Sequence, residues 1–358
     1  MGEDKQHDEA FLKVLRFIAP GTSLRDGLEN ILRAQTGGLI IIGGDDAAVM
    51  KVVDGGFEIN ADFSPNRLYE LAKMDGALIL SGDGKKILRA NAQLVPDPSI
   101  PTSETGTRHR NAERVAKQTG KLVISISQRR NIITLYQDNQ KYVLKDIRVI
   151  LDRANQAVQT LEKYRTVLNQ SLNNLGALEF EDLVTLNDVV TTLQRVEMVL
   201  RISGEIGYYI SELGLEGRLI QMQMEELIVG VKQEGKNILR DYMAEGCVPE
   251  SLNEYVFNNG LHDGLIDLNI IVKNLGFASN TPLDISVSPK GYRILNKIPR
   301  LPSSVIDNLV AAFGSLQGVM EASIAQLDDV EGIGEVRARN IKDGLRRLKE
   351  LILLDQHI

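Results

Sequence analysis

The sequence predicts an α/β N-terminal domain with a mixed central sheet, followed by an all-α spine and a C-terminal helix-hairpin-helix domain. Short β-rich runs alternate with helical patterns up to about residue 145. An apolar repeat typical of a long helix follows, and short helical patterns separated by glycine turns come last. Because 358 residues are too many for one comfortable hydrophobic core, we divide the chain into domains at 1–145, 146–287 and 288–358.

The first domain alternates strands and helices, which is typical of a sheet covered by helices. The predicted strands are runs of aliphatic and β-branched residues at 39–42, 77–80, 122–126 and 132–136. The predicted helices lie near 24–35, 65–73 and 108–118. The turn Gly82-Asp83-Gly84 favours a hairpin partner at 86–90, so we expect strands of both directions in one sheet.

The second domain begins with a heptad-like helix. Its apolar residues recur at alternating steps of four and three, interrupted at Arg165: Ile147, Leu151, Ala154, Val158, Leu161, Leu168, Leu172 and Leu175. A helix of roughly 30 residues would be roughly 45 Å long, which suits a spacer between domains. Further helical patterns cover 182–201 and 216–243. We expect breaks at four glycines: Gly204, Gly207, Gly214 and Gly217.

The third domain contains short helical patterns at 305–313, 319–325 and 336–351, separated by turns at Gly314 and at Gly332-Ile333-Gly334. Two glycines around an apolar residue let the backbone approach a phosphate closely, and the next helix presents its first amides to the same anion. The segment Phe313-Gly314-Ser315-Leu316 resembles a second, degenerate hairpin.

Charge favours DNA for this domain. Residues 335–349 contain six basic and two acidic side chains in a protein that is acidic overall. A glycine-capped turn with a solvated basic face is the alternative interpretation. We favour contact with the DNA backbone, which positions DNA without reading its bases. The predicted DNA-binding residues are Gly332, Ile333, Gly334, Arg337, Arg339 and Lys342.

Composition excludes several classes of protein. The 41 basic and 48 acidic residues give a net charge of -7, which excludes a uniformly basic nucleic-acid-binding protein. Cys247 is the only cysteine and the four histidines are scattered, so we predict neither a disulfide framework nor a Cys/His zinc cluster. With no apolar run near the roughly 20 residues of a membrane span and no signal peptide, we expect a cytoplasmic protein without a membrane partner.

The segment Gly106-Thr107-Arg108-His109-Arg110-Asn111 is the strongest indication of function. Thr107 is the predicted N-cap of a helix, and a helix start offers unpaired N–H groups and a positive dipole end to an anion. Arg108 and Arg110 add forks that match phosphate oxygens in pairs, and His109 can serve as a further donor. The segment therefore predicts a phosphate site.

The surroundings of this segment support the same prediction. Residues 104–130 contain seven Lys or Arg against two Glu. A surface helix with solvated arginines is the alternative, but cations in a first turn oppose the helix dipole, and such placement indicates a functional reason. Ser127 and Arg130 add phosphate donors after the next strand.

Asp75 precedes the run 77–80, so a lone carboxylate lies where a strand begins. Asp-Gly is common in turns, and an ordinary turn residue is the alternative. Phosphoryl transfer needs a cation to neutralise developing charge, and a carboxylate is a natural ligand for Mg²⁺ or Mn²⁺. The chain has no Gly-x-x-x-x-Gly-Lys-Ser/Thr loop, so a P-loop ATPase is not predicted. We predict phosphoryl-transfer chemistry with a metal at Asp75.

Three motifs together resemble the DNA integrity scanning (DisA-type) family of bacterial diadenylate cyclases: Asp75-Gly76-Ala77, Gly106-Thr107-Arg108-His109-Arg110 and Gly332-Ile333-Gly334. The resemblance covers nearly the whole chain and includes 68–74, 94–97, 112–120 and 291–293. Asn111 departs from it, because family members usually carry threonine there. The resemblance implies a nucleotidyltransferase of DNA damage and repair that condenses two ATP molecules into cyclic di-AMP and two pyrophosphates.

The resemblance also implies roles for residues. Asp75 would bind Mg²⁺ or Mn²⁺ and assist the attacking 3′-hydroxyl. The implied catalytic residues are Asp75, Arg108, His109 and Arg110. The expected ATP-binding residues are Gly76, Leu94, Thr107, Arg108, His109, Arg110, Asn111, Ser127 and Arg130.

A two-fold symmetric product made by two identical attacks is most simply built between two identical half-sites, so one chain should hold half an active site. Relatives of this kind form octamers, and the resemblance implies a homo-octamer modulated by branched or junction DNA, in the cytoplasm and at the nucleoid. The alternative is a non-enzymatic DNA-junction scaffold with a nucleotide-sensing domain. A nuclease or ligase is not predicted, because neither clustered acidic metal ligands nor a lysine-centred adenylation motif is present.

Overall fold

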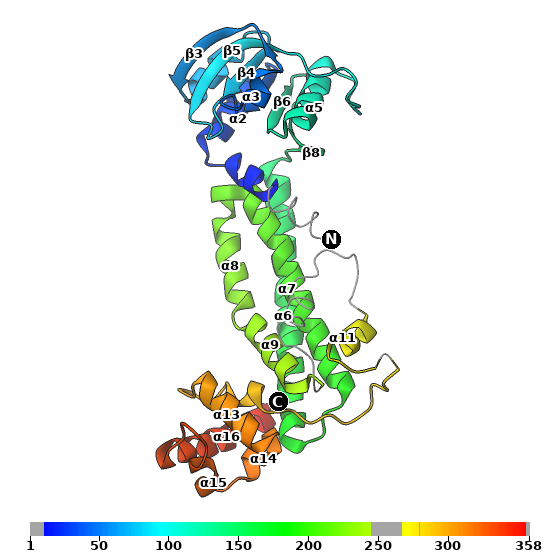
Figure 1. Cartoon of the computed structure of the whole chain (residues 1–358), viewed down its shortest axis with the longest axis vertical. Coiled ribbons are helices and arrows are strands. Elements are labelled where there is room, and N and C mark those ends of the chain that lie inside the picture. The colour runs from blue at the N-terminus through cyan, green and yellow to red at the C-terminus, as the bar shows by residue number, and fades with distance from the viewer. Residues whose placement is uncertain (1–10, 245–266, 279, 356–358) are drawn as a thin grey trace. The chain divides into compact units, whose positions relative to one another are not determined.

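The computed structural model describes residues 11–244, 267–278 and 280–355. The chain forms two compact units. One contains the chain up to Ala154 together with Tyr208–Leu219, and the other contains Asn155–Gly207 together with the chain from Ile220 onward. Figure 1 shows the strands of the first unit in blue to green and the C-terminal helices in orange to red. A mixed sheet, long middle helices and a C-terminal hairpin module confirm the predicted fold class.

Eight strands of the described chain form one sheet in the first unit. They are β1 (Gly38–Ile42), β2 (Val53–Asp54), β3 (Phe57–Asp62), β4 (Ala77–Leu80), β5 (Lys86–Leu94), β6 (Val123–Ser127), β7 (Ile132–Gln137) and β8 (Gln140–Val143). The order is β2-β5-β4-β1-β6-β7-β8, and β3 pairs with β5. β1 is parallel to β4 and antiparallel to β6, so the sheet is mixed, as predicted. The sequence patterns missed β2, β3 and β8, which lack long apolar runs.

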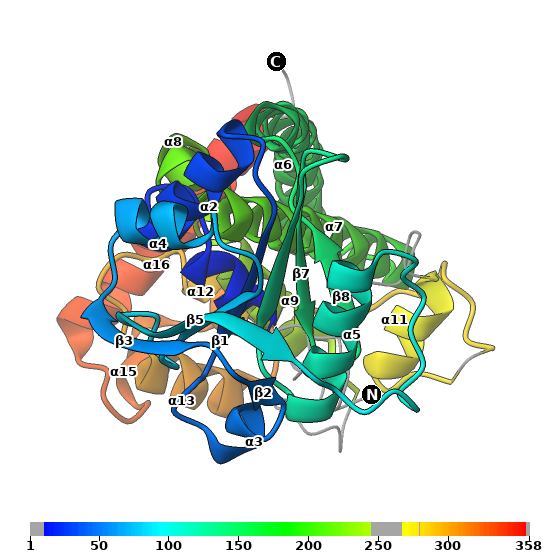
Figure 2. The ribbon, with the colours of Figure 1, turned by 90° about the horizontal axis from the view of Figure 1, so that it is seen from above.

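Helices cover both faces of the sheet: α2 (Ser23–Arg33), α3 (Ala47–Met50), α4 (Pro65–Leu71) and α5 (Thr107–Thr119). Successive residues of β1 point to opposite faces. Ile40 and Ile42 join the core under α2 and α4, and Leu39 and Ile41 join the core under α3 and α5 (Figure 2). Because both faces are buried, β1 has the continuous apolar sequence of an interior strand.

The long helix α6 (Ile147–Glu181) carries the predicted heptad seam. Ala154, Leu161 and Leu168 on this seam are fully buried. Arg165, which interrupts the seam, donates to the carbonyl oxygen of Val229 at 3.3 Å. The remaining helices of this region are α7 (Leu186–Leu213), α8 (Arg218–Ile228), α9 (Val231–Tyr242) and α11 (Leu268–Asn274).

Two of the four predicted glycine breaks are wrong. Gly204 and Gly207 lie inside the continuous helix α7. Ile206 beside them is fully buried, and such packing outweighs the roughly 1 kcal/mol that a glycine costs within a helix. The chain turns instead at Gly214, whose φ is +54°, where the short 3₁₀ helix η1 (Gly214–Gly217) begins.

Five helices form the C-terminal module: α12 (Tyr292–Leu295), α13 (Ser303–Phe313), α14 (Leu316–Glu321), α15 (Ile324–Asp328) and α16 (Glu335–Asp355). Their core includes Ala177 and Phe180 of α6, so the last turns of α6 are part of the module. The prediction that Phe313-Gly314-Ser315-Leu316 resembles the Gly332 hairpin is wrong. Gly314 ends α13 in the left-handed region at φ +72°, and the Ser315 side chain directly caps α14.

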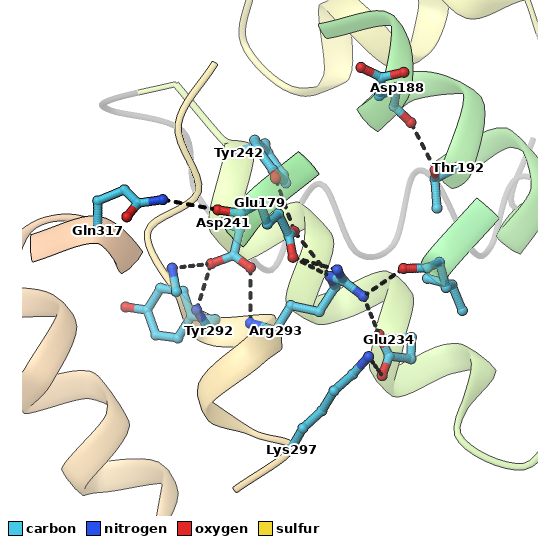
Figure 3. Close-up of polar contacts among 12 residues, drawn as sticks. Glu179, Asp188, Thr192, Glu234, Asp241, Tyr242, Tyr292, Arg293, Lys297 and Gln317 are labelled. Atoms are coloured by element: carbon cyan, nitrogen blue, oxygen red, sulfur yellow. Dashed lines mark hydrogen bonds and ion pairs between the residues drawn. The ribbon is translucent and has the colours of Figure 1, made fainter. Parts of the chain in front are cut away.

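A buried polar cluster, which we call the junction, consists of Glu179 on α6, Asp241 on α9 and Arg293 on α12 (Figure 3). Arg293 Nε lies 3.0 and 3.1 Å from the two carboxylate oxygens of Glu179, and both side chains are fully buried. Asp241 accepts hydrogen bonds from the amides of Gly291, Tyr292 and Arg293 at 2.7, 2.6 and 2.9 Å. These contacts fix the start of α12 against α6 and α9.

Candidate nucleotide and DNA sites

One end of the sheet gathers the predicted nucleotide residues. β1 and β4 are parallel, with Ile40 opposite Leu78, so both begin at this end. β5 is antiparallel to β4, with Ala92 opposite Ala77, and β6 is antiparallel to β1, so both end there. This pairing brings together residues that are far apart in the sequence: Asp75, Gly76, Leu94 and Ser127.

The turn before β4 presents Asp75 to solvent. Gly76 has φ +99°, and a Cβ at this position would lie 2.8 Å from the carbonyl oxygen of Ala92. The turn therefore needs glycine, both for its conformation and for its close approach to β5. Asp75 is exposed, and within the described residues its carboxylate has neither a hydrogen bond nor an ion pair. It is thus free to bind a ligand.

The start of α5 differs by one residue from the prediction. The N-cap is Gly106, with φ −80° and ψ 136°, and no side chain caps the helix, so Thr107 is its first residue. The first amides of α5 therefore remain available to an anion. Arg108 lies against the chain before β1, where a Cβ on Gly37 would be 1.9 Å from its Nη1. Arg110 is exposed. Gly37 was not predicted as a site residue, although the Gly37-Gly38 pair at the start of β1 signals such a close approach.

His109 lies beneath this surface, with 9% of its area exposed. Its Nδ1 is 3.0 Å from the hydroxyl of Tyr136, which donates to Glu104 at 2.8 Å, and Glu104 forms an ion pair with Lys141. Because the tyrosine proton goes to Glu104, its oxygen accepts from Nδ1–H, which leaves Nε2 as the acceptor of a neutral imidazole. Within the described residues this buried Nε2 has no partner.

Electrostatics in this cluster favour a neutral His109. Burial lowers its pKa, and the nearby charges of Arg130 and Lys141 act in the same direction, although Glu104 opposes them. Burial alone would raise the pKa of Glu104, but the hydrogen bonds from Lys141 and Tyr136 lower it. Glu104 is therefore the ionised residue of this pair, and His109 is neutral. No sequence pattern indicated Glu104, Tyr136 or Lys141 as site residues, because their contacts depend on how the strands pair.

The remaining predicted nucleotide residues lie at the same end of the sheet. Asn111 Nδ2 lies 3.5 Å from the carbonyl oxygen of Leu94, at the limit of a hydrogen bond. The Ser127 hydroxyl accepts from the amide of Arg130 at 3.3 Å and so shapes the turn after β6. The Arg130 side chain is exposed. This end of the sheet thus combines one free carboxylate, several cations and unpaired helix amides.

The large cavity of the first unit lies away from these residues. A cavity of about 1150 Å³ in the first unit lies at the opposite end of the sheet, where Ile42, Asp45 and Lys121 line it. In the part of the chain that the structure describes, no three His, Cys, Asp or Glu residues gather as metal ligands. Asp75 alone suits a cation such as Mg²⁺, which commonly takes one or two carboxylates together with substrate phosphates. Four residues considered for cysteine and zinc chemistry lie outside the described residues: His7, Cys247, His262 and His357.

The predicted DNA hairpin is a tight turn between α15 and α16. Gly332 has φ +85°, Ile333 is buried in the core of the module, and the Gly334 carbonyl oxygen accepts from the amide of Ala338 at 2.9 Å. Arg337 donates to the carbonyl oxygen of Gly332. The Arg337 side chain on α16 therefore stabilises the hairpin, and the backbone of the two glycines is exposed.

The other two predicted DNA-binding cations have partners within the module. Arg339 pairs with Glu335 one turn earlier. Lys342 Nζ donates to the carbonyl oxygen of Met320 at 2.6 Å and is partly buried. Arg337 and Arg339 remain exposed, so the basic face is carried mainly by arginines.

Three family models match stretches of this chain. Residues 25–141 match the family described as DisA bacterial checkpoint controller nucleotide-binding, and residues 144–283 match the DisA bacterial checkpoint controller linker region. Residues 315–344 match the helix-hairpin-helix motif. Within the described residues, no helix has the length and apolar character that crossing a bilayer demands.

Two relatives match nearly the whole chain, and a solved structure matches part of it. The DNA integrity scanning protein DisA of Carboxydothermus hydrogenoformans is 62% identical over 347 residues, which is 96% of this chain and 98% of that protein. DisA of Clostridium botulinum strain Loch Maree is 58% identical over 98% of this chain and 99% of that protein. The solved structure of Staphylococcus aureus DacA is 18% identical, with a TM-score of 0.30 over 39% of this chain and 90% of that one. The chain therefore belongs to the DisA family of diadenylate cyclases, in which a nucleotide-binding domain and a helix-hairpin-helix motif occur in one chain.

Proposed function

We propose that this chain condenses two ATP molecules into cyclic di-AMP and two pyrophosphates, with two protomers supplying facing half-sites. The observation that carries the proposal is the exposed Asp75 carboxylate, which has no partner among the described residues and lies at the end of the sheet where the uncapped α5 begins. Asp75, Thr107 and Arg110 are exposed, and the large cavity of this unit lies at the other end of the sheet. A second, identical surface would close the site.

The chemistry consists of two equivalent substitutions. In each, the 3′-hydroxyl oxygen of one ATP attacks the α-phosphorus of the other, the bond to the pyrophosphate oxygen breaks, and the hydroxyl proton passes to solvent. Mg²⁺ or Mn²⁺ bound at Asp75 would neutralise phosphate charge and acidify the attacking hydroxyl. Arg108, Arg110 and the first amides of α5 would hold the phosphates.

The remaining residues would position the nucleotide. Gly76 lets the turn that carries Asp75 pack closely against β5, and the Leu94 backbone at the end of β5 would contact the base. Asn111 reaches the same Leu94 carbonyl oxygen, so it would compete for it or orient it. His109, as a neutral imidazole, would accept a hydrogen bond at Nε2 from a nucleotide N–H or O–H, and would not donate to a phosphate as expected from the sequence.

We further infer that DNA bound by the C-terminal module modulates this activity, that branched DNA is preferred, and that the protein works as a homo-octamer in the cytoplasm and at the nucleoid. The exposed glycine hairpin and its arginines support contact with a phosphate backbone. The assay is cyclase turnover with and without a four-way junction. We expect lower turnover with the junction, and unchanged turnover at saturation would contradict the coupling.

The half-site arrangement has its own test. Wild-type protein incubated with ATP and Mg²⁺ or Mn²⁺ should yield cyclic di-AMP by mass spectrometry. When wild-type protein is mixed with an excess of Asp75→Asn protein, most wild-type chains pair with a variant chain. Only one of the two phosphodiester bonds then forms, and the linear product pppApA accumulates. A constant ratio of cyclic to linear product would refute facing half-sites. ATP binding without any dinucleotide would favour the nucleotide-sensing scaffold instead.

A further inference from the structure

Residues 95–105, which we call the strap, connect β5 to α5 without forming a helix or a strand. The strap begins directly after Leu94, the proposed base contact, and ends directly before Gly106, where the uncapped α5 begins. Most connections in compact domains are about half as long, and long ones are usually functional. The strap therefore joins the two ends of the proposed ATP site.

One face of α5 holds the backbone of the strap through four polar side chains: Glu113, Arg114, Lys117 and Gln118. In the last turn of α5, Gln118 Oε1 accepts from the amide of Asp97 at 2.9 Å. One turn earlier, Arg114 Nε donates to the carbonyl oxygen of Ile100 at 2.9 Å. The strap therefore runs back along α5, from the end of the helix toward its start.

Glu113 is the buried residue of this face, with 8% of its area exposed. Its Oε2 accepts from the amide of Ser103 at 3.1 Å and from the hydroxyl of Thr102, and its Oε1 pairs with Lys117 at 2.8 Å. Burial alone would raise the pKa of this carboxyl, but the hydrogen bonds from Lys117 and Thr102 lower it. Glu113 is therefore ionised, and both of its oxygens hold the protein's own chain.

Apolar packing fixes the middle of α5 more firmly than its first turn. Val115 and Ala116 are fully buried against the sheet. In the first turn Thr107 is exposed, and Gly106 supplies no side-chain cap. The first turn is therefore held by the contact of His109 with β7 and by the strap that leads into it.

We propose that Glu113 is a positioning residue for ATP: by holding the strap, it keeps the phosphate-binding start of α5 at the distance from the Leu94 backbone that one ATP molecule spans. The inference rests on the proposed function. A ligand that binds two sites at once gains affinity only while it can bridge the spacing between them. A loosened strap would leave the contacts at each end intact and remove this gain.

The deciding variant is Glu113→Ala in the full chain. The probe is 3′-deoxyadenosine triphosphate, which lacks the attacking hydroxyl and is not turned over. We expect its Kd to rise about tenfold, as for the loss of one hydrogen bond to a charged group. The Kd values of 3′-deoxyadenosine and of tripolyphosphate, which each occupy one end of the site, should change by less than about twofold. In turnover with ATP, KM should rise while kcat stays nearly constant.

Two further variants separate positioning from a general loss of stability. Asp46→Ala removes a carboxylate at the other end of the sheet that also binds a lysine and a backbone amide, those of Lys121 and Ala48, at 2.8 Å each. It should lower the melting temperature and leave the Kd of the triphosphate unchanged. Thr102→Val keeps the shape of the strap and removes one bond to Glu113, so it should raise this Kd about threefold even where Glu113→Ala does not fold.

Glu113→Gln retains an oxygen for the Ser103 amide and should recover most of the triphosphate affinity. An unchanged Kd of the triphosphate in the folded variants of Glu113 and Thr102 would overturn the proposal. An equal loss for the triphosphate, the nucleoside and tripolyphosphate would also overturn it, because the contacts at each end would then be weakened. A wild type that binds none of the three probes would instead refute the proposed function itself.

Discussion

Arg108 and Arg293 each lie near the start of a helix: Arg108 in the first turn of α5, where the helix dipole disfavours a cation, and Arg293 in the single turn of α12. Arg108 at the start of α5 is partly exposed and, among the described residues, no carboxylate pairs with it. Arg293 at the start of α12 is fully buried and is held by Glu179 from α6. An arginine near a helix start therefore serves the protein's own packing in the second unit, whereas in the first unit we propose that it serves a ligand. The presence of a protein counter-charge distinguishes the two.

The largest expected effect tests the buried side of this comparison. Glu179→Ala leaves the Arg293 guanidinium buried without its counter-charge, and we expect the free energy of unfolding to fall by about 3–5 kcal/mol. Urea unfolding of the full chain, followed by circular dichroism, measures this. In the double variant Glu179→Leu, Arg293→Met both charges are absent, and stability should largely return. A Glu179→Ala protein as stable as the wild type would show that the junction does not hold the module.

A change at the exposed nucleotide site should have the opposite effect: it should reduce activity and leave stability unchanged. Asp75→Asn removes a carboxylate that has no partner among the described residues, so we expect the unfolding free energy to stay within about 0.5 kcal/mol of the wild type. Turnover to cyclic di-AMP should fall by at least about 10²-fold, because the charge that would hold the metal is lost. Activity is measured by mass spectrometry and stability by urea unfolding. An undiminished yield of cyclic di-AMP would show that Asp75 is not part of the active site.

The third test uses pH at the junction. Burial and the neighbouring charge of Glu179 raise the pKa of Asp241 to about 7, against the hydrogen bonds from three amides. Between the unfolded pKa near 4 and this value the folded state binds more protons, so its stability is greatest at low pH and is lost as pH rises through about 7. We expect the melting temperature to fall by roughly 5 °C more in the wild type than in Asp241→Asn between pH 5 and 8. Parallel curves for the two proteins would contradict this.

Whether a contact could be predicted from the sequence depends on how far apart its two residues lie along the chain. The Asp75 turn and the Arg108 segment are local patterns, and their chemistry is visible in a few consecutive residues. Glu179 and Arg293 are 114 residues apart, and no periodicity indicates that they pair. Within the cyclase unit, Glu104 and Tyr136 meet beneath α5 because of strand pairing, which the sequence does not specify in advance.

Glycine patterns predicted some turns of the chain correctly and others wrongly. The Gly332-Ile333-Gly334 turn was found from its two glycines, but the turn between α12 and α13 was not, because Arg300 there adopts the left-handed conformation in place of glycine. Conversely, Gly204 and Gly207 suggested breaks where α7 continues. Glycine permits a turn, and packing of the neighbouring apolar residues decides whether one forms.

The smallest expected effect concerns Tyr136, a buried residue of the first unit whose hydroxyl contacts His109 in the candidate nucleotide site. Tyr136 accepts from His109 and donates to Glu104, so it is a positioning residue that sets the imidazole tautomer. Tyr136→Phe keeps the ring packing and removes only the hydroxyl. We expect about 1 kcal/mol less stability and a loss of turnover of roughly threefold. Nitrogen chemical shifts of His109 provide the separate readout, since Nε2 should no longer remain the bare nitrogen. If turnover falls while the tautomer stays fixed, Tyr136 acts through packing, and the unpaired Nε2 is not what the active surface uses.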